Sequence, residues 1–272
     1  MIDLKSIINS TTKYNFHSHT QFCDGRATME EFVIEAIAQG MEHYGFSPHS
    51  PINIQSPCNM SFEAIELYLD EFSRLKVKYG NEINLYASLE IDYLDGWGPA
   101  NQFFQSLPLD YRIGSVHFIP SFDVPGEYVD VDGRYENNFK VKMENEFHDD
   151  IEAVVRSYFA QEMKLITEGG FDIIAHCDKI SHNASCHRPG IDLEPWYDAL
   201  VKQTFDAIMD HHYLIEVNTK AWKEYNRFFP NSRWFSLLKQ YDAPIIFSSD
   251  AHYPNLVNAG RDKAIELFKN SL

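Results

Sequence analysis

Short apolar segments alternate with amphipathic helical segments along most of the chain, and this alternation restricts the fold more than any other feature. Segments with the length and composition of buried strands occur near 14–19, 43–47, 84–91, 111–117, 171–176, 213–218 and 244–249. Helices are predicted at 28–40, 61–79, 99–105, 150–168, 194–210, 232–240 and 256–268. Strands that alternate with helices pair in parallel, so the sequence predicts an α/β fold with a parallel strand arrangement.

The length of 272 residues suits one large domain, because (β/α) barrels commonly reach this size as a single unit. We find no repeat, low-complexity run or convincing linker, and therefore predict one domain over 1–272. Between 119 and 149 the regular pattern gives way to an aromatic and acidic stretch that contains Pro120 and Pro125. A stretch of this length without regular structure is usually functional or disordered, and we interpret it as a loop excursion over the mouth of the barrel.

Most of the predicted strands end in a histidine or a carboxylate. The first strand leads into His17 and His19, whose side chains lie on the same face because strand side chains alternate. The last strand leads into Asp250 and His252, with the same spacing. The strand ends between them supply His49, Glu90, His117 and His176. Groups from the first and last strands can meet only if the strands close, so we favour a barrel over a doubly wound sheet.

Imidazole and carboxylate groups are the ligands of catalytic zinc, manganese and iron, whereas structural zinc sites favour thiolates. With Asp24 there are nine candidate ligands, which is more than one metal ion can use. We therefore expect two or three divalent ions that share carboxylates, a cluster suited to phosphoryl chemistry. A small structural zinc site formed by Cys177, His182, Cys186 and His187 is an alternative, although this segment lacks a Cys-x-x-Cys pair.

The 23 basic and 40 acidic residues give a formal net charge of −17, which repels nucleic acids and anionic membranes. We expect neither as a partner. The first residues lack the basic and apolar regions of a signal peptide, and no apolar run is long enough to span a bilayer, so we expect a cytoplasmic protein. Four cysteines are too few for a disulfide framework.

Eight motifs in this order resemble the polymerase and histidinol phosphatase (PHP) family. They are His17-x-His19, Asp24-Gly25, Pro48-His49, Glu90, Ser115-Val116-His117, Ala175-His176, Glu216-Val217-Asn218 and Ser249-Asp250-x-His252. The resemblance covers essentially the whole chain and is greatest to the stand-alone histidinol-phosphate phosphatases of histidine biosynthesis. It implies a distorted (β/α)7, TIM-like barrel with a trinuclear site, which hydrolyses the small molecule L-histidinol phosphate to L-histidinol and phosphate.

The resemblance also implies how the ligands are divided among three metal ions. The first ion would take His17, His19, Glu90 and Asp250; the second Glu90, His117 and His176; and the third Asp24, His49 and His252. Glu90 would bridge the first two ions, and a metal-bridging hydroxide would attack phosphorus without a protein nucleophile. Asp24 stands where other members can carry histidine, and Asp24, His252 or a metal-bound water is the candidate general acid.

Recognition of the phosphate should also involve a guanidinium group, whose fork matches phosphate oxygens. Arg188 and Arg227 follow the fifth and sixth strands and are our candidates, with a solvated or helix-capping arginine as the alternative. For the substrate ammonium we expect an acid or an aromatic ring within 118–147.

Two other functions fit parts of the sequence. The first is a phosphoesterase that acts on nucleotides or short oligonucleotides, which the net charge of −17 disfavours. The second is a structural or regulatory metal-binding module, which would not need this many open ligand positions. Neither the native metal nor the oligomeric state follows from the sequence.

Overall fold

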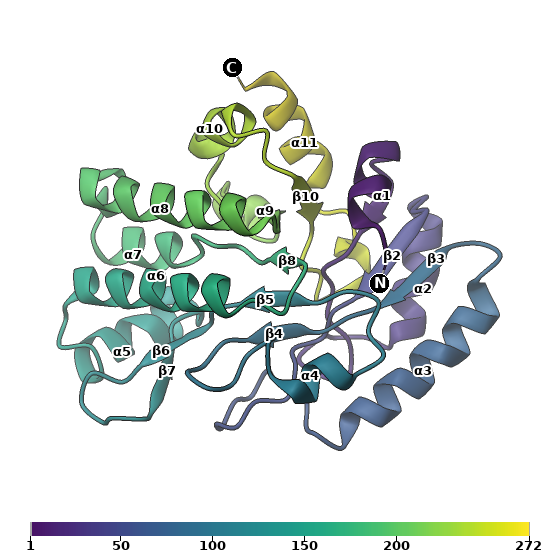
Figure 1. The fold of residues 1–272 in the computed structure, drawn as a ribbon, viewed down its shortest axis with the longest axis horizontal. Coiled ribbons are helices and arrows are strands. Elements are labelled where there is room, and N and C mark those ends of the chain that lie inside the picture. Colours follow the sequence, from purple (N-terminus) through teal and green to yellow (C-terminus); the bar gives the residue numbers. More distant parts are fainter. Residues whose placement is uncertain (1, 272) are drawn as a thin grey trace.

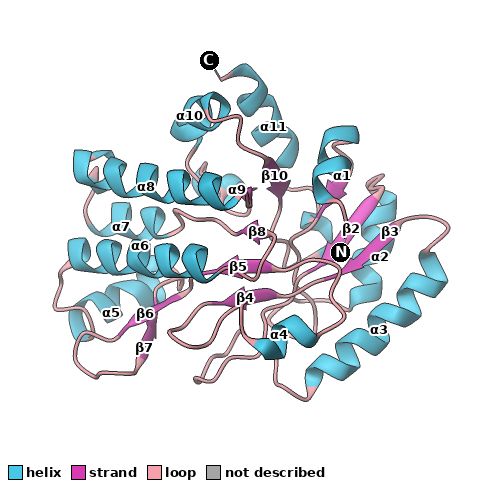
Figure 2. Cartoon of the chain, in the orientation of Figure 1, coloured by secondary structure: helices cyan, strands magenta, loops and turns pink. Residues whose placement is uncertain are grey.

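Parallel strands lie in the centre of the molecule and helices cover them from outside, in a computed structural model that describes residues 2–271 (Figure 1, Figure 2). One sheet has the order β1 (Tyr14–Asn15), β2 (His43–Phe46), β3 (Asn84–Ala87). The other has the order β10 (Ile245–Ser248), β9 (Leu214–Asn218), β8 (Ile173–Ile174), β5 (Ile113–Ser115), β4 (Glu90–Asp92). Every pair in both sheets is parallel, which confirms the predicted fold class.

The predicted strand 84–91 is divided into β3 and β4, which belong to different sheets. Single bridges link the two sheets on both sides: His49 pairs with Glu90, and Ser18 pairs with Ala251. Parallel pairing therefore passes from one sheet to the other at two places, although the links are isolated bridges and not continuous ladders. Both bridges lie at or beside predicted metal ligands.

Side chains from both sheets also share one buried apolar cluster. Phe16 follows β1, while Ile113, Ile173, Leu214 and Ile246 come from four strands of the other sheet, and all are at most 3% exposed. Leu4 joins this cluster from α1 (Leu4–Ser10), a helix that the sequence analysis did not predict. This cluster therefore joins the two sheets through their side chains.

The outer helices largely match the predicted segments. They are α2 (Met29–Ala38), α3 (Ala64–Tyr79), α4 (Gln102–Ser106), α6 (Ile151–Glu168), α8 (Pro195–His211), α10 (Phe235–Gln240) and α11 (Arg261–Asn270). A capping box begins α2, since the Thr28 hydroxyl accepts from the Glu31 amide and the Thr28 amide donates to the Glu31 carboxylate. The predicted helix 256–268 is instead a 3₁₀ turn (Pro254–Leu256) and α11, separated by Gly260 at φ 74°.

The excursion at 119–149 is folded and not a bare loop. It contains the antiparallel pair β6 (Phe118–Pro120) and β7 (Tyr128–Asp130), a π-helix (Tyr135–Phe139) and α5 (Lys140–Asn145). Phe139, Met143 and Phe147 are fully buried, so the excursion packs against the core beside α6 (Figure 1). The sequence analysis missed these short elements because each is held by packing and not by a long periodic pattern.

Two more short helices follow strands of the larger sheet. They are α7 (Ile180–His187), where a loop was expected, and α9 (Trp222–Tyr225). Further 3₁₀ turns occupy Ile191–Leu193 and Ser232–Trp234. Both helices border the cavity described below, so they bear directly on the site.

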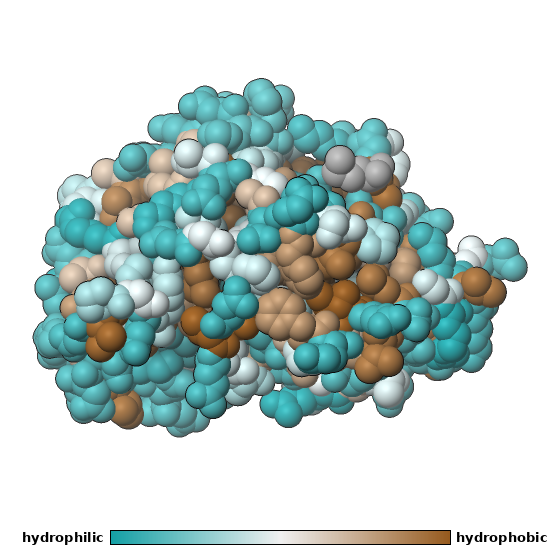
Figure 3. Space-filling model, turned by 60° about the horizontal axis from the view of Figure 1, so that its bottom comes forward, coloured by the Kyte–Doolittle hydropathy of each residue, from teal (hydrophilic) through white to brown (hydrophobic). Residues whose placement is uncertain are grey.

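Figure 3 shows apolar side chains among polar ones on the lower face of the molecule. Phe62, 41% exposed, packs edge-on against Trp97 and Phe103 on the surface near α3 and α4. Within residues 2–271, none of the helices combines the length and apolarity that crossing a membrane would require.

Candidate metal centre

The nine predicted ligands come together at the carboxyl ends of the parallel strands. They are His17 and His19 after β1, Asp24 in the following turn, His49 after β2, Glu90 in β4, His117 after β5, His176 after β8, and Asp250 and His252 after β10. Seven of them are buried, while Asp24 and His252 are partly exposed. Residues that are 235 positions apart in the chain therefore line one site.

Glu90 lies at the centre of this cluster. Its Oε2 is 3.2 Å from Nε2 of His17 and 3.1 Å from Nδ1 of His49. Its Oε1 is 3.0 Å from Nε2 of His176 and 3.5 Å from Nε2 of His117. The two oxygens thus face different imidazoles, which is the arrangement that a bridging carboxylate needs.

The ligand atoms fall into three compact groups like those that the family resemblance implied. The groups are His17/His19/Asp250, Glu90/His117/His176 and His19/Asp24/His49/His252, each with ligand atoms within 4.8 Å of one another. His19 belongs to two groups, and a fourth group, His49/Asp92/His117, adds a carboxylate that was not predicted. The alternative zinc site at 177–187 forms no such group in the part of the chain that the structure describes.

Several buried ligand atoms have no hydrogen-bond partner. They are His17 Nε2, His19 Nε2, Asp24 Oδ1 and His49 Nδ1. Carboxylate oxygens approach three of these imidazoles, but not with hydrogen-bonding geometry. A buried polar atom without a partner is costly, and divalent cations in the two groups that contain these residues would satisfy all four atoms. The donor set therefore fits metal ions.

Burial and neighbouring charges shift the pKa values of the cluster in different directions. Burial lowers the pKa of His17, but the carboxylates of Glu216 and Glu90 outweigh it and raise this pKa well above its usual value. Burial raises the pKa of Glu90, but the surrounding imidazoles outweigh it and hold this pKa well below its usual value. Burial lowers the pKa of His176 to about 4. An ionised Glu90 and a neutral His176 are both in the form that binds a cation.

A sequence model of the PHP domain matches residues 15–220. The chain belongs to the PHP family. The matched segment contains seven of the nine clustered residues, and the structure brings Asp250 and His252, which follow it, into the same PHP site.

Similarity to individual proteins extends over most of the chain. It is 27% identical to the histidinol-phosphatase of Bacillus subtilis over 88% of this chain and 93% of the relative. It is 24% identical to a probable histidinol-phosphatase of Schizosaccharomyces pombe, over 89% of this chain and 81% of that protein. Among solved structures, the histidinol phosphate phosphatase of Lactococcus lactis, complexed with zinc, L-histidinol and phosphate, has a TM-score of 0.71 at 20% identity. That likeness covers 94% of this chain and 92% of the other, and it shows that the fold is shared.

Carboxylates hold the second nitrogen of two histidines in the PHP site. Glu216 Oε1 is 2.7 Å from His17 Nδ1, and Asp92 Oδ1 is 2.6 Å from His117 Nδ1. Such contacts fix the ring and its tautomer, so that the other nitrogen faces the metal. The sequence analysis quoted Glu216 without this role and omitted Asp92. The sequence could have identified Asp92, because it comes two residues after Glu90 and its side chain therefore lies on the same face of the strand.

Steric constraints require a glycine after Asp24. A Cβ atom at Gly25 would lie 2.6 Å from the carbonyl carbon of His19 and closer still to the amide nitrogen of Thr20. The turn that carries Asp24 can therefore fold back against the His19 strand end only with glycine at this position.

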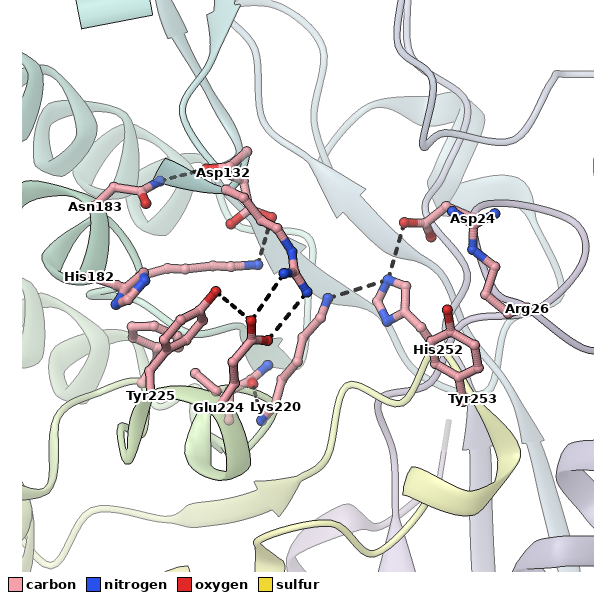
Figure 4. A pocket seen from close by; sticks show the side chains of 16 residues that line it. Asp24, Arg26, Asp132, His182, Asn183, Lys220, Glu224, Tyr225, His252 and Tyr253 are labelled. Atoms are coloured by element: carbon pink, nitrogen blue, oxygen red, sulfur yellow. Dashed lines mark hydrogen bonds and ion pairs between the residues drawn. The ribbon is translucent and has the colours of Figure 1, made fainter. Parts of the chain in front are cut away.

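A cavity of about 370 Å³ opens beside the cluster (Figure 4). Asp24, Asn218 and His252 form the wall that it shares with the metal site. The remaining Lys, Arg, Asp and Glu side chains come from the turn after Asp24, from the excursion, from the segment before α7, and from α9 and the segment before it; they are Arg26, Asp132, Arg134, Lys179, Lys220 and Glu224. His182 and Tyr225 lie at the far end, with ring centroids 4.1 Å apart and planes tilted by 34°.

Neither predicted phosphate-binding arginine lines this cavity. Arg227 pairs with Asp192 at 2.6 Å, and Arg188 pairs with Glu194 at 3.0 Å. Arg26, Arg134 and Lys220 line the cavity instead, and Lys220 contacts the predicted ligands. Its Nζ is 3.3 Å from both Asp250 Oδ1 and His252 Nε2. Lys220 comes two residues after the Glu216-Val217-Asn218 motif, and this proximity to a strand end could have identified it.

Proposed function

We propose that this protein is a metal-dependent phosphomonoesterase that hydrolyses L-histidinol phosphate to L-histidinol and phosphate. The observation that carries the proposal is the cluster of nine ligands beside a cavity with cationic side chains. The two relatives named as histidinol-phosphatases, similar over more than four fifths of their length, support the same substrate. So does the Lactococcus lactis structure, which was solved with L-histidinol and phosphate.

We assign three metal positions to the ligand groups of the cluster. The first uses His17, His19, Glu90 and Asp250, the second Glu90, His117 and His176, and the third Asp24, His49 and His252. Zinc, manganese and iron all suit imidazole and carboxylate ligands. When bound, such ions polarise phosphoryl oxygens and make water a stronger nucleophile. This chemistry needs no protein nucleophile.

The side chains around the cluster have separate tasks in this proposal. Lys220, beside Asp250 and His252, offsets the charge of the incoming phosphate. Lys179 is nearly buried and paired with Asp132 at 2.8 Å, so it adds positive charge to the same wall at a fixed position. Asp24 and His252, the candidate general acids, line the cavity 3.2 Å apart. Burial raises the pKa of Asp24, but the hydrogen bond to His252 and the imidazoles of His19 and His49 outweigh it and hold this pKa well below its usual value, which favours His252 as the proton donor.

A small substrate fits the electrostatics better than a nucleic acid does. The chain has a formal net charge of −17, and Asp132 and Glu224 carry negative charge into the cavity itself. Inside the cavity these acids are paired with Arg134 and Lys179, so one phosphate group is tolerated there, whereas the net charge of the whole chain repels a polyanion that extends beyond the cavity. We therefore propose a cytoplasmic enzyme with a small-molecule substrate, in preference to a nuclease or a membrane-bound enzyme.

Phosphate release by metal-reconstituted protein tests the proposal. L-histidinol phosphate would be compared with nucleotides, sugar phosphates and a short single-stranded oligonucleotide under identical conditions. We expect a strong preference in kcat/KM for L-histidinol phosphate. Equal or weaker activity on this substrate than on the nucleotides would contradict the proposal and favour the nucleotide phosphoesterase.

A further inference from the structure

An ion pair crosses the cavity from the excursion to α9. Arg134 Nη1 lies 3.0 Å from Glu224 Oε1, and Nη2 lies 3.3 Å from Oε2. Tyr225 donates its hydroxyl to the same Oε1 at 2.9 Å and thereby orients the carboxylate. Figure 4 shows Glu224 between Tyr225 and Lys220, with its carboxylate directed into the cavity.

In this pair, Glu224 can exchange the guanidinium of Arg134 for another cation. The side chains of Arg134 and Glu224 are 67% and 50% exposed, and exposed ion pairs contribute little to stability. Within residues 2–271, Glu224 is the sole hydrogen-bond partner of this guanidinium. The other acid in the cavity outside the metal cluster, Asp132, is held instead by the nearly buried Lys179. Glu224 is therefore the carboxylate that an incoming cation can reach.

The position of Glu224 matches the chemistry of the proposed substrate. In L-histidinol phosphate the carbon that bears the ammonium is bonded to the carbon that bears the ester oxygen. With phosphorus at the metal cluster, the ammonium must therefore lie in the part of the cavity nearest to the cluster. Lys220, which contacts the cluster, and Glu224 are four residues apart across the start of α9 and line the same wall. The adjacent rings of His182 and Tyr225 then border the space left for the imidazole.

We propose that Glu224 is the specificity-determining residue that binds the substrate ammonium, which replaces Arg134 as its partner. This inference rests on the proposed function and adds to it the reason for preferring an aminoalkyl phosphate over a neutral alkyl phosphate. It differs from the expectation of an ammonium site within 118–147, since in this proposal that segment supplies the exchangeable cation, Arg134, and α9 supplies the acid.

The test compares L-histidinol phosphate with its desamino analogue, 3-(imidazol-4-yl)propyl phosphate, on the metal-loaded enzyme. The readout is the ratio of the two kcat/KM values. Glu224→Gln keeps the size of the side chain but removes its charge, and we expect this ratio to fall about 10- to 100-fold, mainly through KM for L-histidinol phosphate.

Two control variants separate recognition from a structural effect. Arg134→Gln removes the same ion pair but leaves the carboxylate, so the ratio should be retained or should rise. Glu152→Gln breaks a comparable exposed pair with Arg156 on α6, away from the cavity, and should leave the ratio unchanged. The inference is overturned if Glu224→Gln retains the wild-type ratio, or if Arg134→Gln lowers it equally.

The wild-type protein distinguishes the failure of this inference from the failure of the proposed function. A wild-type enzyme that does not hydrolyse L-histidinol phosphate overturns both. A wild-type enzyme that prefers L-histidinol phosphate, together with an unchanged ratio in Glu224→Gln, overturns the ammonium site alone.

Discussion

Single carboxylates decide how the histidines of the metal site are held. Glu216 is fully buried and uses both oxygens: Oε1 meets His17 Nδ1, while Oε2 accepts from the amide of His176 and from Asn218 Nδ2. Asn218 also donates to Asp250 at 3.1 Å. One acid thus fixes ligands that come from three different strands.

Glu216→Gln tests this positioning role. Glutamine replaces one of the two carboxylate oxygens with an NH₂ group, which cannot accept a hydrogen bond. On the Oε2 side this group would face two donors, the amide of His176 and Nδ2 of Asn218. We expect the affinity for metal to fall about 10- to 100-fold while the fold is retained. Competition with a chromophoric chelator measures the affinity, with the surface variant Glu82→Gln as the control. An affinity equal to that of the wild type would show that Glu216 does not hold the ligands.

Glu162 is a buried acid outside the metal site. It lies in α6, is fully buried, and neither of its carboxylate oxygens has a hydrogen-bond partner within residues 2–271. Burial raises its pKa from 4.5 to about 8, so the folded protein keeps it protonated at neutral pH. The unfolded chain releases this proton above pH 4.5, and the group therefore lowers the free energy of unfolding as pH rises from about 4.5 to 8.

Glu162→Gln should remove this pH-dependent cost. Glutamine has nearly the shape of the protonated acid but cannot ionise, so the variant should gain a few kcal/mol over the wild type at pH 8.5 and little at pH 5. Urea unfolding of both proteins at several pH values measures the difference. A difference that does not change with pH would refute the assignment of a protonated Glu162.

At the scale of elements, the turn at 19–25 determines whether the third metal position forms. It places Asp24 against His19 because Gly25 has no Cβ atom to collide with residues 19 and 20. Gly25→Ala must shift this backbone and with it Asp24. Since displacements of about 1 Å can cost 100-fold in rate, we expect a loss of that order in kcat/KM and a lower metal content.

Gly40→Ala provides the matched control for Gly25→Ala. Gly40 has φ 75°, so alanine there strains the backbone, but its Cβ would meet no atom within 4 Å. We expect lower stability with the metal content and activity retained. Full metal content and activity in Gly25→Ala would show that the turn adapts, contrary to the steric argument.

The strands and helices also show which parts of the fold could be predicted from sequence patterns. The strands were predictable as short, fully buried apolar runs, and the long helices were predictable because their burial repeats with a fixed period. Eight of the nine clustered residues lie at or just after strand ends, and Asp24 lies in the turn that follows the first strand. The division of 84–91 into β3 and β4 was not, since an apolar run does not encode a change of sheet. The contact of Arg227 was not predictable for a similar reason. This residue follows a strand end, but Asp192, 35 residues away, holds it outside the cavity, and this contact follows from the folded loops alone.

At the scale of the whole molecule, the ligands come from both sheets. His17, His19 and His49 follow strands of the three-stranded sheet, and the residues from Glu90 onward belong to the five-stranded sheet or follow its strands. The bridges between the sheets lie at the same place, as Ser18 pairs with Ala251 and His49 with Glu90. Metal ions held here would therefore tie together the two parts where backbone pairing is weakest.

Removal of metal should destabilise the protein without unfolding it. The apolar cluster inside the strands, which includes Phe16 and Ile113, does not depend on the ligands, so the fold should persist after chelation. A ligand at 100 times its Kd stabilises a protein by about 2.7 kcal/mol, which corresponds to a Tm decrease of roughly 5–10 °C on its removal. Chelation should abolish phosphate release, lower Tm by this amount and leave the far-UV circular dichroism at 25 °C unchanged.

Readdition of zinc or manganese should restore phosphate release and Tm. Loss of the circular dichroism signal on chelation would instead support a structural role for the metal, because binding would then be coupled to folding.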